Sequence, residues 1–173
     1  ACLNPEMASE ITLQPIRRHG VAAAIFFSDI VVPLKVLGVD VDIVPGRGPV
    51  LGSPVRTAED VARLTSIDPA GLDEGLAPVR EAVERTVAEL TERNNTPLIG
   101  FAGAPFTLAA YLVEGGPSKD HIRARTLMHA DPEAWAALMA WTAEVTGRFL
   151  RAQIFAGASA AQLFDSWAGS LSL

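Results

Sequence analysis

Three polar side chains that could do chemistry each lie beyond an apolar run of this sequence. Asp29 interrupts the run FFSDIVVP, Tyr111 lies a few residues after the run that ends at Gly103, and Ser166 follows the run that ends at Phe164. A carboxylate among apolar side chains loses hydration, which is costly unless something compensates for the loss. Asp29 is therefore either satisfied by a structural hydrogen-bond donor or kept for a ligand.

Each of these residues also has an ordinary structural explanation. An aspartate after a strand is commonly a helix N-cap or a turn residue, and for Asp165 we prefer that explanation. Tyr111 could be a core tyrosine whose hydroxyl is satisfied. Other conspicuous residues are expected at the surface, in caps, in helix packing or at a solvated helix end: His19, His121, His129, Trp135, Trp141, Arg17 and Arg18.

The elements that would position these side chains begin with three apolar runs. Residues 21–27 are nearly continuous in apolar residues and 97–103 form a second such run, as expected of buried strands of a parallel sheet, and 159–164 form the third predicted strand. Helical segments separate the runs, and this alternation is typical of an α/β fold. Ligands bind beyond the carboxyl ends of parallel strands in such folds. If the sheet closes into a barrel, Asp29, Tyr111 and Ser166 should lie together at the mouth formed by the carboxyl ends of the strands.

Helix signals separate the predicted strands at several places. A helix should begin at Asn4-Pro5, a cap followed by proline, and end at Gly20. The next signals predict one or two helical turns within residues 30–37, then a half-exposed strand at 39–44 and a Gly/Pro turn. A short helix should follow, capped by Thr57 with Asp60, and then a helix over 74–93. Pro105 should open another helix, and a long helix should begin after Asp131-Pro132.

The composition is that of an ordinary globular domain. The chain has 173 residues, of which 49% are apolar and 20% charged, enough for one domain with a core. A net charge of −6 argues against a nucleic-acid partner. The single cysteine, Cys2, excludes a disulfide framework and a cysteine-based metal site, and no apolar run reaches the roughly 18 residues of a membrane span. We expect a cytoplasmic setting without a membrane partner, and a chain that is part of a longer protein.

Three long blocks of the sequence resemble the uroporphyrinogen decarboxylase family. They are RRHGVAAAIFFSDIVVPLKVLGVDVDIVPGRGP, PLIGFAGAPFTLAAYLVEGG and QLFDSWAG, and together they extend the resemblance over essentially the whole chain. The resemblance implies a (β/α)8 TIM barrel, about half of it present as one partial domain over residues 1–173, and a homodimer when full length. It also implies an enzyme without cofactor or metal that removes the carboxyl groups of the four acetate side chains of uroporphyrinogen III, giving coproporphyrinogen III.

The resemblance also implies roles for six residues. Asp29 matches the aspartate that lies under the macrocycle and accepts hydrogen bonds from the pyrrole N–H groups. A fixed carboxylate there would stabilise the cation that forms when a pyrrole carbon is protonated. Tyr111 and Ser166 match polar contacts to the carboxylate arms of the substrate. The positions that match the lining of the family's cleft are Phe27, Phe101 and Gly103.

Two other functions remain open at this point. The family's arginine-rich segment, which binds the substrate carboxylates, and a histidine near its C-terminus are not among these 173 residues. The chain could therefore be a non-catalytic fragment that at most binds porphyrinogen or pairs with a partner chain. It could also be a corrinoid-linked methyltransferase on the same fold, although such relatives bind zinc through His and Cys ligands and this chain has one cysteine.

Overall fold

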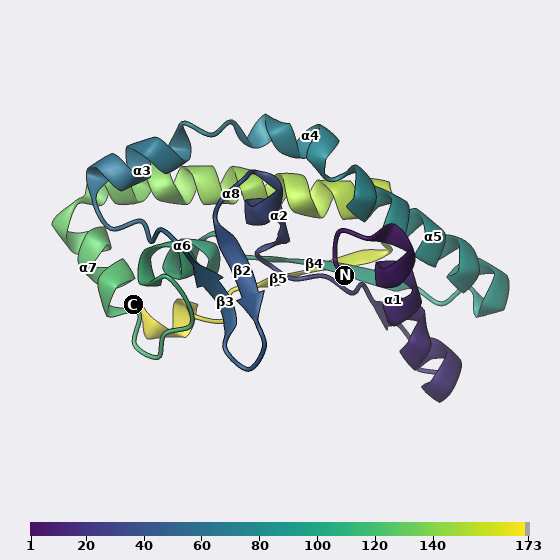
Figure 1. Ribbon diagram of the computed structural model, residues 1–173. Helices are drawn as coiled ribbons and strands as arrows, with labels where there is room; N and C mark the ends of the chain where they lie inside the picture. Colours follow the sequence, from purple (N-terminus) through teal and green to yellow (C-terminus); the bar gives the residue numbers. More distant parts are fainter. Residues whose placement is uncertain (172–173) are drawn as a thin grey trace.

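A three-stranded parallel sheet forms the centre of the computed structural model, which describes residues 1–171 (Figure 1). The strand order is β1 (Ala24–Ile25), β4 (Leu98–Gly103), β5 (Ala160–Phe164), and both neighbouring pairs are parallel. Gly103 is the register partner of Phe164, so β4 and β5 end at the same level. The predicted α/β fold with parallel strands is confirmed.

The first helix forms where the cap signals predict it. In α1 (Pro5–His19), the Asn4 side chain accepts a hydrogen bond from the backbone N–H of Met7 (2.9 Å). The helix ends at Gly20, which adopts a left-handed conformation with φ +58°. Pro15 lies inside the helix without ending it. The predicted bounds of this helix are confirmed.

Two long helices, α5 (Ala77–Asn94) and α8 (Pro132–Phe155), cover one side of the sheet (Figure 1). The side chain of Gln153 on α8 is fully buried and binds the backbone of Phe101 on β4. It accepts a hydrogen bond from the Phe101 N–H (2.9 Å) and donates one to the Phe101 carbonyl (2.8 Å). This pair of bonds fixes α8 against the middle strand.

Shorter elements complete the described chain. Residues 41–44 and 48–51 form an antiparallel hairpin where a half-exposed strand and a Gly/Pro turn are predicted. The capping box of Thr57 with Asp60 is confirmed, and the helix predicted over 74–93 is interrupted at Leu76. The α7 helix was not predicted. The elements are α2 (Val32–Val36), β2 (Val41–Val44), β3 (Gly48–Leu51), α3 (Ala58–Thr65), α4 (Leu72–Gly75), α6 (Pro105–Glu114) and α7 (Ile122–Ala130), with short 3-10 turns η1 (Pro69–Gly71) and η2 (Ala168–Ser170).

Burial differs among the three strands, and this corrects the prediction that residues 21–27 form a strand buried on both faces. The middle strand β4 is largely buried, but every residue of β5 is exposed. The first strand is only two residues long, and its Ile25 is 64% exposed. Within residues 1–171, β1 and β5 each pair with β4 alone, so each has an open edge. An apolar run is buried on both faces only when further elements cover it.

The core lies between the sheet and the helices packed on it. Its fully buried members include Leu108 on α6 and both Leu138 and Phe149 on α8. Across the part of the chain that the structure describes, no helix combines the length and apolar character needed to cross a membrane.

Candidate active site at the strand ends

Asp29 is half-buried in the loop that follows β1. Its Oδ1 accepts a hydrogen bond from the backbone N–H of Val31 (3.0 Å), and its carbonyl accepts one from the N–H of Val32 (3.1 Å). This turn leads into α2, so the structural role expected of an aspartate after a strand is present. No described residue donates a hydrogen bond to Oδ2, which leaves one carboxylate oxygen for a ligand.

Tyr111 on α6 lies within the electrostatic influence of Asp29. Burial raises the pKa of the phenol, and the negative charge of Asp29 raises it further. No described residue forms a hydrogen bond with the phenol oxygen, so the alternative of a core tyrosine with a satisfied hydroxyl is not what the structure shows. The pKa of the Cys2 thiol is also raised, mainly by burial and secondarily by Asp29, against a lowering by the terminal amino group. Sequence reasoning missed this proximity of Cys2 to Asp29.

Ser166 is exposed in the loop that follows β5. The backbone N–H of Ala104 donates to the carbonyl of Phe164 (2.8 Å) and joins the chain just after β4 to the end of β5. The neighbouring ring of Trp167 stacks on Tyr111, with 4.2 Å between ring centroids. These contacts place the Ser166 loop beside the helix that carries Tyr111.

Asp165 is a turn residue, as expected. Its carbonyl accepts a hydrogen bond from the N–H of Ala168 (3.2 Å). Its carboxylate does more than the turn requires, because Oδ1 accepts a hydrogen bond from the hydroxyl of Thr107 in the first turn of α6 (3.1 Å). Asp165 therefore fastens the Ser166 loop to α6.

Phe27 and Phe101 are half-buried and line a groove of about 580 Å³ between α1 and β1. The groove also holds Ser28, whose buried Oγ has no hydrogen-bond partner in the described part of the chain. The ring of Phe101 meets Phe164 edge to face, with 5.7 Å between ring centroids. Aromatic surface therefore lies close to the three strand ends.

Gly103 is buried where the loop of Asp29 crosses the end of β4. A Cβ built at this position would lie 3.0 Å from the Cβ of Ile30 and 3.2 Å from the Cδ2 of Leu108. Glycine therefore allows Ile30, the neighbour of Asp29, to sit close against the strand.

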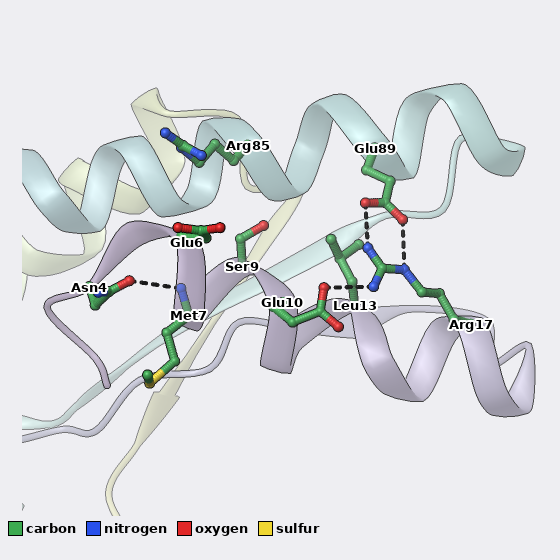
Figure 2. A pocket seen from close by; sticks show the side chains of 9 residues that line it. All are labelled: Asn4, Glu6, Met7, Ser9, Glu10, Leu13, Arg17, Arg85 and Glu89. Atoms are coloured by element: carbon green, nitrogen blue, oxygen red, sulfur yellow. Dashed lines mark hydrogen bonds and ion pairs between the residues drawn. The ribbon is translucent and has the colours of Figure 1, made fainter.

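A different pocket, of about 510 Å³, lies between α1 and α5 and contains none of the six candidate site residues (Figure 2). Its central group is Arg17, which binds Glu10 (2.6 Å) and both carboxylate oxygens of Glu89 (2.6 and 2.9 Å). Hydrogen bonding to Arg17 is the main reason that the pKa of Glu89 falls to about 2. These ion pairs neutralise the charge of Arg17 and join α1 to α5. We therefore do not take this pocket as the active site.

His121 departs from the expected surface or cap role. It stands at the N-cap position of α7, but its side chain is buried and caps no backbone group. Its ring packs against Phe106 and Trp167 instead. His19 and His129 are exposed, as expected.

The strand ends thus combine a carboxylate, a phenol, a hydroxyl and aromatic rings. A fixed carboxylate with a free oxygen can accept hydrogen bonds from ligand N–H groups and stabilise a developing positive charge. The phenol and the hydroxyl can donate hydrogen bonds to anionic groups. Among residues 1–171, no group of three or more His, Cys, Asp or Glu side chains is placed to hold a metal ion. The arrangement offers a ligand one acceptor for N–H groups and two hydroxyl donors.

Comparison with known proteins identifies the family of the chain. The sequence model of the uroporphyrinogen decarboxylase (URO-D) family matches residues 1–173. The chain belongs to this family. It is 73% identical to a uroporphyrinogen decarboxylase of Leifsonia xyli subsp. xyli, over 99% of this chain and 45% of that protein. It is 69% identical to one of an Arthrobacter species, over all of this chain and 48% of that protein. The chain therefore spans about half the length of the curated relatives that it matches.

A solved structure supports the fold. A methyltransferase from Methanosarcina mazei superposes with a TM-score of 0.73 over 92% of this chain and 45% of that chain, at 17% identity. At this identity the likeness shows the fold alone. The chain is about half of a (β/α)8 barrel, which confirms the expected fold class. The methyltransferase alternative is not favoured, because the relatives at 58 to 73% identity are uroporphyrinogen decarboxylases.

Proposed function

We propose that the protein to which this chain belongs is a uroporphyrinogen decarboxylase. It converts the four acetate side chains of uroporphyrinogen III to methyl groups, giving coproporphyrinogen III, without a metal or cofactor. The observation that carries the proposal is the free Oδ2 of Asp29 beyond a parallel strand, close to Tyr111, in a chain of this family.

In this proposal Asp29 stabilises the charge that develops during decarboxylation. A proton adds to a pyrrole carbon, and the positive charge spreads onto the ring nitrogen. The bond between the acetate CH2 and its carboxyl carbon then breaks, CO2 leaves, and the electron pair neutralises the ring. A proton added at the former CH2, with loss of the first proton from the ring, leaves a methyl group. Oδ2 of Asp29 accepts a hydrogen bond from the pyrrole N–H. The fixed charge of this carboxylate stabilises the cation more strongly than water would.

The other five residues bind and enclose the substrate. Tyr111 and Ser166 donate hydrogen bonds to its carboxylate arms, while Phe27 and Phe101 cover part of the macrocycle. The half-burial of both phenyl rings near the strand ends supports this assignment. Gly103 contributes by letting the loop of Asp29 pack closely on β4.

We further propose that residues 1–173 are part of a single barrel domain of a cytoplasmic homodimer. The exposure of every residue of β5 supports the first point, because an apolar edge strand needs a further strand beside it. The single cysteine supports a reducing compartment. The net charge of −6 supports a protein that binds no nucleic acid, since an acidic surface repels phosphate.

Turnover by the full-length protein tests the proposed function. The protein is dialysed against EDTA and mixed with uroporphyrinogen III under anaerobic, reducing conditions. The products are oxidised to porphyrins and separated by chromatography according to their number of carboxyl groups. We expect stepwise loss of carboxyl groups down to coproporphyrinogen III. Binding of the substrate without release of CO2 would overturn the proposal and support the non-catalytic alternative.

A further inference from the structure

His121 combines two features that are unfavourable for a residue that only fills space. Its side chain is 3% exposed, yet neither ring nitrogen has a hydrogen-bond partner in the described part of the chain. Buried polar atoms without partners cost stability. Its backbone also has φ +48°, which is uncommon for a residue other than glycine. Such features persist where neighbouring groups need one particular side chain.

The ring of His121 belongs to an aromatic stack beside the candidate active site. Trp167 is the shared member: its ring centroid lies 4.4 Å from that of His121 and 4.2 Å from that of Tyr111. The edge of Phe106 meets the imidazole at 6.4 Å between centroids. Because Trp167 directly follows Ser166 in the chain, the stack connects His121 to both residues proposed to bind carboxylate arms.

The backbone around His121 is anchored at the end of the helix that carries Tyr111. Glu114, the last residue of α6, accepts hydrogen bonds from two backbone N–H groups in the first turn of α7 (2.9 and 3.1 Å). The N–H of His121 donates to the hydroxyl of Ser118 (3.2 Å). Tyr111 lies on α6 one turn before Glu114. The backbone around His121 is therefore joined to the helix that carries Tyr111, and Trp167 packs between the two rings.

We propose that His121 is a positioning residue of the active site, whose ring holds Trp167 and thereby sets the positions of Tyr111 and Ser166. This inference rests on the proposed function, because it takes those two residues as contacts to the substrate. Histidine suits the position because it is an aromatic ring that is also enriched in left-handed backbone. Asparagine accepts this backbone but cannot stack, whereas phenylalanine stacks but is less suited to the backbone.

Three substitutions in the full-length protein separate the ring from the backbone. His121→Phe keeps a ring, His121→Asn keeps the backbone preference, and His121→Leu keeps neither. Since an aromatic pair contributes modestly, we expect KM for uroporphyrinogen III to rise roughly three- to tenfold in the Asn and Leu variants and to stay within about twofold of wild type in the Phe variant. We expect kcat to be nearly unchanged in all three variants, because His121 does not touch the reacting atoms.

The position of Trp167 is measured separately by 19F NMR of protein labelled with 5-fluorotryptophan. Its resonance is assigned by its loss in Trp167→Phe. We expect this resonance to move in His121→Asn and His121→Leu and to stay closer to wild type in His121→Phe. If the Leu variant fails to fold, as judged by circular dichroism, the Phe and Asn variants decide.

Several outcomes would overturn the inference alone. The first is an unchanged KM in all folded variants, and the second is an equal rise of KM in His121→Phe and His121→Asn. The third is a fall of kcat at unchanged KM. Each applies when the wild-type protein turns over normally. Absence of turnover by the wild-type protein would instead overturn the proposed function, and this inference with it.

Discussion

A methyl group at position 103 should disturb the loop of Asp29 without touching its carboxylate. A Cβ on Gly103 would lie 3.0 Å from the Cβ and 3.3 Å from the Cδ1 of Ile30, closer than nearly all contacts of real Cβ atoms. The Cβ of Ile30 is attached to the backbone, so the loop itself must move. Overpacking of this kind costs about 1–3 kcal/mol, and the lower chain entropy of alanine returns up to about 1 kcal/mol. We expect Gly103→Ala to lower the free energy of unfolding by about 1–2 kcal/mol.

Gly147 provides a matched control for this substitution. It lies within α8, and a Cβ added there would meet no atom within 4 Å. Gly147→Ala should therefore raise the free energy of unfolding by about 0.5–1 kcal/mol. Both variants are measured in the full-length protein by urea unfolding and by turnover. Gly103→Ala should also lower kcat, since small displacements of reacting groups are costly. Wild-type stability and turnover in Gly103→Ala would refute the role of close packing at this glycine.

Two further predictions concern hydrogen bonds that hold helices in place. Gln153→Leu should lower the free energy of unfolding by about 2–4 kcal/mol, because it leaves the N–H and carbonyl of Phe101 without partners. The exposed Gln162→Leu is its control, and equal stability of the two variants in urea would contradict the prediction. Glu89→Gln should reduce the loss of Tm in acid, because the pKa of Glu89 is lowered from 4.5 to about 2 by its hydrogen bonds with Arg17. The stabilisation by Glu89 is complete above pH 4.5 and is lost as the pH falls towards 2. A Tm difference between wild type and Glu89→Gln that stays constant over this pH range would contradict the prediction.

Helix ends were predictable because capping depends on residues within one turn. Asn4 and Asp131 each accept a backbone hydrogen bond from the first turn of the helix they precede. Thr57 and Asp60 form the reciprocal bonds of a capping box. No distant part of the chain is needed for these interactions, so their sequence signals were sufficient.

The burial of strands was not predictable from apolar runs alone. Leu163 and Phe164 end a mainly apolar run, but both side chains are exposed because β5 pairs on one side only within the described residues. Burial depends on which elements lie beside and above a strand. A run of residues cannot contain that information.

The candidate site was predictable in part. The position of Asp29 after an apolar run indicated a strand end, and the rule for parallel sheets brought Tyr111 and Ser166 to the same end. The turn formed by Asp29 is local and was among the expected roles, whereas the stack around Trp167 depends on contacts between separate elements. His121 was missed because most of its neighbours in the sequence are polar, and its burial comes from rings elsewhere in the chain.

The negative charge of Asp29 is the feature on which the proposed reaction depends most. Asp29→Asn removes this charge and keeps a side-chain oxygen that can accept the N–H of Val31, so the turn should survive. In the full-length protein we predict an unchanged Tm and a kcat about 10²–10³-fold below wild type, with Asp165→Asn as a control that retains near-normal kcat. A kcat close to wild type in Asp29→Asn would contradict the role of this charge in decarboxylation.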